Sequence, residues 1–275
     1  MRPFVENFPF FCIFLALVAG ILSATFRSGR AAYRMTLAVT GAIAVLSALT
    51  LRYVVEGGLS FGYTMGRFPI PLGNAIRCGP LQALLCTVFA GVLLFALVGG
   101  SRDLFHDVLP EKQRFYFVMV NLTDAALLSL VYTNDAFTGY VFIEISTIAA
   151  CALVMAKDNG PNLIATIRYL FMSLMGSGLF LIGLALLNSI TGYLLMPSMA
   201  EAVARLAETG EYRVPLTVCA GLMVTGLGIK SAMFPFHLWL PDAHGGATTA
   251  SSALLSGLVL KGYIVLMMTL MVRVF

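Results

Sequence analysis

The feature that most restricts the fold of this chain is a series of apolar stretches, each about 20 residues long. A helix of that length crosses the hydrocarbon core of a bilayer, where every backbone N–H and C=O must be paired within the spanning element. Of the 275 residues, 59% are hydrophobic and only 11% are charged, whereas a soluble domain carries about 25% charged residues. Eight spans are expected, at Phe8–Phe26, Met35–Val55, Leu81–Val98, Phe115–Tyr132, Ala136–Met155, Ile164–Leu187, Val214–Met233 and Ser251–Val274.

The sequence therefore predicts an all-α, polytopic membrane protein with about eight transmembrane helices. The first stretch is longer than the core of a signal peptide, and no clear small-residue cleavage site follows it, so we expect an anchor. Glu56–Pro80 is rich in glycine and proline and is expected to form an irregular or hairpin segment. Pro197–Gly210 has the pattern of a short amphipathic interfacial helix, although a plain surface helix would have the same pattern.

Composition and cysteine spacing argue against several classes of function. The net charge of +4 is modest, and the arginines fall mainly between apolar stretches, where they contact headgroups and set orientation. We therefore expect no binding to nucleic acid. The five cysteines are widely spaced and form no CxxC pair, which argues against zinc, iron–sulfur and disulfide sites. We expect no metal, no cofactor and no catalytic residue on this chain.

Four ionisable residues lie deep inside the predicted helices. Asp124 is midway along the fourth helix, Glu144 is near the middle of the fifth, Lys230 is late in the seventh, and Lys261 is near the middle of the eighth. A charge at the bilayer centre costs about 2.5–3.5 kcal/mol even on the lenient insertion scale. Such residues usually face a protein interior or a wet cavity and mark ion paths. The four charges sum to zero, so the group can be neutral if its members interact.

Each of these residues also has a purely structural interpretation. Lys230 is close enough to a helix end to snorkel to the interface on its long stem. Glu144 and Lys261 are too central for easy snorkelling, so their structural alternative is an ion pair, and Asp124 would be accommodated as a protonated, hydrogen-bonded group. The residues alone leave these alternatives open.

A proline interrupts the seventh apolar stretch. Pro235 has no backbone N–H and clashes with the carbonyl of Ser231, one turn earlier. A freed carbonyl inside a membrane must be satisfied by protein or water, and broken helices are a common way to build ion sites. His237 and His244 follow, and histidine can gain or lose a proton near neutral pH, as a proton relay requires. Capping of helix ends at the interface is the alternative role for both.

Two segments carry a resemblance to a known family. Lys230–His244 (KSAMFPFHLWLPDAH) and Ser252–Lys261 (SALLSGLVLK) resemble the antiporter-like proton-pumping subunits of respiratory complex I, Mrp-type cation/proton antiporters and membrane-bound hydrogenases. Asn134–Ser146 is similar to the fifth helix of that family. The strings EISTI and LLSGLVLK look closest to the Mrp and hydrogenase branches. The resemblance is strong from about Asp135 to Phe275.

The resemblance implies a role for five of the ionisable side chains. Glu144 resembles the glutamate of the family's lysine–glutamate switch, and Lys230 resembles its partner on the broken seventh helix. Lys261 resembles the lysine that passes protons along the central hydrophilic axis. His237 and His244 match positions near that axis.

The chain also departs from the family pattern. Members usually have about fourteen helices in two inverted five-helix repeats, whereas this sequence contains eight expected helices. We expect residues 1–114 to form three helices with their loops, and residues 115–275 to form one repeat, helices four to eight, with a broken seventh helix. Asp124 lies where the family is usually uncharged, and Gly245–Thr249 lacks the usual proline.

Three hypotheses for the function follow. The first is a proton- or sodium-translocating membrane subunit of a redox-driven complex, such as a membrane-bound hydrogenase or complex I relative, with no redox centre of its own. The second is a subunit of an Mrp-type antiporter, and the third is a non-conducting structural half-subunit. We expect a multi-pass protein of the cell inner (cytoplasmic) membrane. Its expected partners are lipid, other membrane subunits including one that supplies the second repeat, and peripheral iron–sulfur or hydrogenase-type subunits.

Overall fold

The computed structural model of the protein describes residues 4–58, 60–64, 75–157, 159–210 and 212–275. Within these residues, eight helical segments are long and apolar enough to cross a membrane, as the sequence predicted. The first seven spans contain α1 (Phe8–Thr25) with the preceding 3-10 turn Phe4–Asn7, α2 (Gly29–Gly57), α3 (Pro80–Gly99), α5 (Gln113–Tyr132), α6 (Ala136–Val154) with the turn Met155–Lys157, α7 (Gly160–Thr191) and α9 (Arg213–Lys230). The eighth combines α11 (Thr249–Leu254), a π-helical turn (Leu255–Val259) and α12 (Leu260–Arg273).

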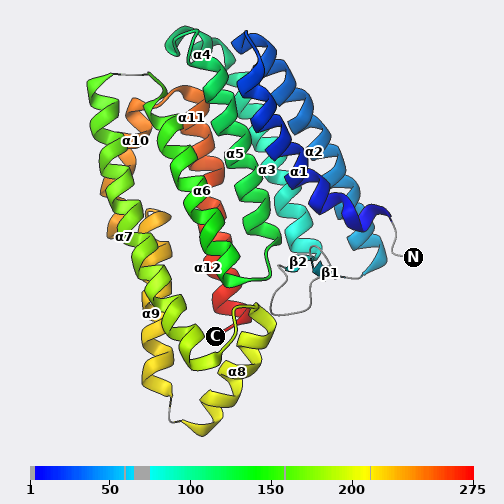
Figure 1. Ribbon diagram of the computed structural model, residues 1–275, viewed down its shortest axis with the longest axis vertical. Coiled ribbons are helices and arrows are strands. Elements are labelled where there is room, and N and C mark those ends of the chain that lie inside the picture. The colour runs from blue at the N-terminus through cyan, green and yellow to red at the C-terminus, as the bar shows by residue number, and fades with distance from the viewer. Residues whose placement is uncertain (1–3, 59, 65–74, 158, 211) are drawn as a thin grey trace.

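The spans form a layer of roughly aligned helices (Figure 1). α1 and α2 lie at one side of this layer, α7 and α9 lie at the other, and α5, α6 and α12 lie between them. The span made by α5 is the most enclosed, with 78% of its apolar window buried against 28–50% for the other seven. A polar side chain on α5 therefore lies in protein rather than in lipid.

Short elements cover the two ends of the layer. α4 (Ser101–Asp107) lies at the upper end in Figure 1, and α8 (Met196–Thr209) lies at the lower end. The predicted amphipathic helix is confirmed in α8, which buries Met196, Met199, Ala202 and Val203 on one face. Backbone bonds from Ala136 to Leu194 and from Met196 to Asn134 tie this helix to the start of α6.

The predicted hairpin segment is confirmed as two short antiparallel strands. β1 (Phe61–Thr64) pairs with β2 (Ala75–Cys78), and Phe61 is opposite Cys78. Residues 65–74 lie outside the described residues. The N–H of Asn134 donates to the carbonyl of Ala75 at 3.0 Å, so the hairpin is anchored to the end of α5.

Glycines bring α7 and α9 into backbone contact. A Cβ added to Gly176 would lie 2.7 Å from the carbonyl oxygen of Gly226, and one added to Gly226 would lie 2.5 Å from that of Gly176. Small residues at such a crossing let membrane helices pack closely without a hydrophobic driving force. The crossing lies one turn before Lys230 and fixes that end of α9 against α7.

The seventh span is broken as predicted, but the break begins earlier than the proline. α9 ends at Lys230, and the chain resumes in a 3-10 turn (Phe236–Trp239) and α10 (Leu240–Gly246). Ala232 takes a left-handed conformation with φ of 53°, its N–H bonds to the carbonyl of Ile229, and the N–H of Met233 bonds to that of Gly228. This is a Schellman stop signal, which closes the helix before Pro235 is reached.

Candidate ion-translocation site

The structure brings two of the predicted site residues together in an ion pair. The Lys230 Nζ lies 3.3 Å from the Glu144 Oε1, and their side chains are 0% and 24% exposed. Ser177 on α7 donates a hydrogen bond to the same carboxylate oxygen. Because the ammonium group is fully enclosed, snorkelling of Lys230 to the interface is excluded. The pair joins α6 to the broken end of α9.

Hydroxyl groups complete the surroundings of the lysine. Lys230 Nζ donates to Thr147 Oγ1 at 2.7 Å, and the Thr147 and Ser146 hydroxyls both donate to the carbonyl of Ile143. The Tyr263 hydroxyl is 3.1 Å from Ser146 Oγ and 3.2 Å from Thr147 Oγ1, and its single proton can be donated to either oxygen. The Lys230 Nζ also lies 5.6 Å from the centre of the Tyr263 ring, a cation–π distance. A connected set of proton-bearing groups therefore runs from α9 through α6 to α12.

Side chains give the last carbonyls of α9 hydrogen bonds in addition to those from backbone N–H groups. The Trp239 indole donates to the carbonyl of Ile229, and Ser231 Oγ donates to that of Leu227. The Trp239 ring stacks on Tyr169 of α7 with a centroid distance of 4.5 Å. These contacts meet the requirement that irregular backbone at membrane depth be paired within the protein.

His244 and Lys261 form a second part of the predicted site. Nδ1 of His244 is 2.7 Å from Ser252 Oγ. Burial, and to a smaller extent the charge of Lys261, lower the pKa of His244 below its ordinary value of 6.5. A neutral imidazole at pH 7 is able to accept a proton. Lys261 follows a π-helical turn and is exposed on the surface of the chain.

Two further predicted residues lie apart from the ion pair. His237 is half-buried, its ring stacks on Phe234 at 5.8 Å, and its Nδ1 has no hydrogen-bond partner in the described part of the chain. Asp124 is 3% exposed on α5, and its Oδ2 likewise has no partner among the described residues. The described residues therefore do not give Asp124 the hydrogen bond that was expected for its protonated form.

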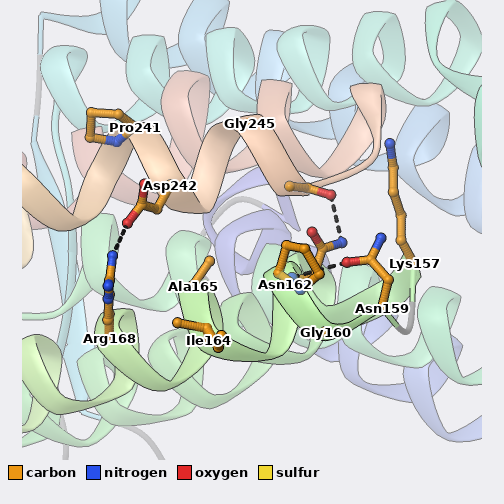
Figure 2. Close-up of a pocket in the computed structure, with 12 residues that line it drawn as sticks. Lys157, Asn159, Gly160, Asn162, Ile164, Ala165, Arg168, Pro241, Asp242 and Gly245 are labelled. Atoms are coloured by element: carbon orange, nitrogen blue, oxygen red, sulfur yellow. Dashed lines mark hydrogen bonds and ion pairs between the residues drawn. The ribbon is translucent and has the colours of Figure 1, made fainter.

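A groove of about 820 Å³ lies beside α10 at its contact with the start of α7 (Figure 2). Arg168 on α7 reaches across it to Asp242 on α10, with 2.5 Å between Nη1 and Oδ2. Asn162 Nδ2 donates to the carbonyl of Gly246 at 2.6 Å, and the N–H of Asn162 is capped by Asn159 Oδ1 at 3.0 Å. Through these contacts α7 holds the segment that follows the helix break.

Several side chains that contact the ion pair were missed by sequence reasoning. Thr147 and Tyr263 contact Lys230, and Ser177 contacts Glu144, yet none of them is ionised at neutral pH. One signal was available, because Thr147 lies three residues after Glu144 and shares its helix face. Ser177 and Tyr263 come from other spans, so no spacing rule connects them to the pair.

The fold and the site together define a polytopic membrane protein with a buried lysine–glutamate pair at a broken helix. Residues 133–275, more than half of the chain, match the family described as "NADH:quinone oxidoreductase/Mrp antiporter, TM". The chain belongs to this family, and the resemblance seen in the sequence is confirmed.

Curated relatives come from both branches of the family. NADH-quinone oxidoreductase subunit N of Desulforudis audaxviator is 31% identical over 253 residues, which cover 90% of this chain and 48% of the relative. An Na(+)/H(+) antiporter subunit of Bacillus subtilis is 27% identical, with 94% of this chain and 51% of the relative covered. The chain thus spans about half the length of these relatives.

Solved structures share the fold. A chain in the Mrp complex from Dietzia sp. DQ12-45-1b matches with a TM-score of 0.86 and 23% identity, covering 100% of this chain and 50% of that one. A chain in the membrane-bound sulfane sulfur reductase, an archaeal respiratory membrane complex, matches with a TM-score of 0.82 and 24% identity, covering 96% and 52%. Both neighbours are parts of multisubunit membrane complexes.

Proposed function

We propose that this chain is a proton-translocating membrane subunit of a redox-driven multisubunit complex, such as a membrane-bound hydrogenase or a complex I relative. The observation that carries the proposal is the ion pair of the fully buried Lys230 with the partly buried Glu144 at the broken end of α9. An enclosed ion pair is costly to bury and adds little net stability compared with apolar residues, so a functional reason for it is required. Amine, carboxylate and hydroxyl groups are proton carriers, and an ammonium group repels sodium, which favours protons over sodium as the cargo.

The proposed mechanism is a two-state switch. While Glu144 lies next to Lys230, its negative charge holds a proton on the amine. When the pair separates, burial disfavours the charged amine, and the proton moves towards Lys261 through water and histidine. His244, beside Lys261, is the better placed of the two histidines, because its imidazole is within the electrostatic reach of that lysine. The energy that separates the pair would come from partner subunits that hold the redox centres.

An Mrp-type antiporter subunit is the second candidate. It is favoured by the Bacillus subtilis relative, which is named as an Na(+)/H(+) antiporter subunit and aligns with 94% of this chain. The relative named NADH-quinone oxidoreductase subunit N, with the higher identity, favours the redox-driven proposal. The division at residues 114/115, the repeat formed by helices four to eight, the inner-membrane location and the iron–sulfur or hydrogenase-type partners remain part of the proposal.

The proposal is tested on the natively purified complex in proteoliposomes. We expect Glu144→Gln and Lys230→Ala each to abolish proton uptake, because each change removes one half of the switch. Glu56→Gln and Arg52→Ala are matched controls, since these residues form an exposed ion pair on α2 and the substitutions are chemically similar.

Co-purification of partner subunits checks assembly in all four variants. Normal proton gradients in both site variants would show that the chain is a structural subunit. Sodium-coupled exchange without any electron donor would assign it to the Mrp type instead.

A further inference from the structure

A column of buried polar side chains runs between α1, α2 and α5, away from the Lys230 site. Serine and threonine are common where membrane helices pack, but a buried amide or carboxyl group in such a place needs a partner within the protein. No member is more than 3% exposed. The members are Ser23 on α1, Thr36, Thr40 and Ser47 on α2, and Asn121 and Asp124 on α5.

At two levels of this column, on either side of its centre, the polar side chains of neighbouring helices contact one another. Asn121 Nδ2 donates to Thr36 Oγ1 at 2.9 Å and to Ser23 Oγ at 3.3 Å. Further along, Cys12 Sγ lies 3.8 Å from Ser47 Oγ. The polar groups in these two layers therefore satisfy one another.

The layer between them is not paired. α2 and α5 are the second and fourth of eight alternating spans and run in the same direction. Thr40 is one turn beyond Thr36, and Asp124 is about one turn beyond Asn121, so both lie at the same level of the column. Thr40 Oγ1 and Asp124 Oδ2 both lack a hydrogen-bond partner among the described residues.

The missing bond of Thr40 is informative. A threonine inside a helix ordinarily donates to the carbonyl four residues earlier, as Thr50, Thr87 and Thr123 do here. Thr40 makes no such bond in the described structure. Its hydroxyl is therefore available to the carboxyl group at the same level.

The surroundings of Asp124 favour a neutral acid. No basic side chain in the described residues acts on it, and the titratable groups that face it are the thiols of Cys12 on α1 and Cys86 on α3. An unpaired carboxylate in such a place is far costlier than a protonated one. Leu127, one turn beyond Asp124 on α5, packs tightly against α12, because a Cβ added to Gly262 would lie 2.5 Å from its Cδ2.

We propose that Asp124 is a second proton-binding site: a neutral carboxylic acid that bonds the Thr40 hydroxyl when it holds its proton, a contact the two groups do not make in this structure, and that exchanges its proton with solvent along the column. Ser23, Thr36 and Asn121 continue the polar path towards the connection between α1 and α2, near the membrane surface. The proposal rests on the packing of α1, α2 and α5 and is independent of the function proposed for Lys230.

Infrared spectroscopy of the intact, natively purified complex tests the site. Asp124→Asn should remove one C=O band of a protonated carboxylic acid, and that band should move to lower frequency in D₂O. Thr40→Val should keep the band and move it to higher frequency, because the acid loses its hydrogen-bond partner. Glu144→Gln, the same type of change at the carboxyl group of the ion pair, should leave the band in place.

Three outcomes would overturn the proposal. Loss of a carboxylate band rather than an acid band in Asp124→Asn would mean that the group is ionised. A band that stays unshifted after prolonged exposure to D₂O would mean a sealed structural proton. If Asp124→Asn fails to assemble, Thr40→Val decides the matter, because an unchanged acid band in that variant contradicts the coupling of the two groups.

Discussion

Among the residues that the structure describes, the ammonium group of Lys230 is positioned by one neutral acceptor, Thr147 Oγ1, in addition to Glu144. Replacing this threonine by valine keeps the shape and removes the acceptor, and a hydrogen bond to a charged group contributes about 1.5–3 kcal/mol. Because about 1.4 kcal/mol corresponds to a factor of ten, we expect Thr147→Val to lower the rate of proton uptake by about tenfold or more. Thr147→Ser should restore most of the rate, because it restores the hydroxyl. A valine variant that pumps at the normal rate would show that Glu144 alone positions the lysine.

A second residue-scale prediction concerns His244. Burial is the main cause of its lowered pKa, and the charge of Lys261 is the smaller one. Removing that charge in Lys261→Gln should therefore raise the pKa of His244 slightly, while burial keeps it below 6.5. Nuclear magnetic resonance titration of labelled histidine in the complex measures this shift. Lys157→Gln, which alters a lysine paired with Asp107, is the control and should leave the titration of His244 unchanged.

At this scale the sequence was most informative for charged residues. Glu144 and Lys230 could be singled out because charges in apolar helices are costly. Thr147, Ser177 and Tyr263 could not, since hydroxyl groups inside membrane helices often only bond their own backbone. Their role depends on how α6, α7 and α12 come together, which no local pattern in the sequence specifies.

The α7–α9 crossing carries the clearest prediction at the scale of elements. A Cβ at Gly176 would meet the carbonyl of Gly226 at 2.7 Å and the Lys230 Cγ at 3.1 Å, whereas one at Gly178 would meet nothing within 4 Å. Gly176→Ala should push the helices apart, at a cost of about 1–3 kcal/mol for overpacking, and should displace Lys230. We expect lower thermal stability and slower proton uptake than in Gly178→Ala, two residues along the same helix. Equal behaviour of the two variants would mean that the crossing is loose.

The elements themselves were largely predictable from the sequence, and the exceptions have a physical cause. Eight spans follow from apolar length, and α8 follows from its alternation of apolar and polar faces. The end of α9 was expected at Pro235, but a left-handed alanine, Ala232, closes the helix first. Alanine is the best helix former, so propensity gives no warning of a stop at this position. The π-helical turn before Lys261 likewise has no signature in the residues Leu255–Val259.

At the scale of the whole molecule, the face of α12 that carries Lys261 is not covered by the other described helices. Lys261 lies at the midpoint of the span Thr249–Arg273 and is exposed. A lysine that faces lipid at this depth would cost about 2.5–3.5 kcal/mol. The relatives are about twice as long as this chain, and the structural neighbours are parts of multisubunit complexes. We therefore expect protein, rather than lipid, to cover this face of α12.

Site-specific photocrosslinking in the natively purified complex tests this expectation. A photoreactive residue in place of Lys261 should form adducts with protein, because the polar path has to continue beyond α12 for the charge to be tolerated. Met268 lies two turns further along the same face and is 57% exposed. The same probe at Met268 should reach the same polypeptide, and mass spectrometry of the adducts identifies the segment. Lipid adducts at both positions would show that the face is open to the bilayer, and would remove the onward path for protons that the proposed function requires.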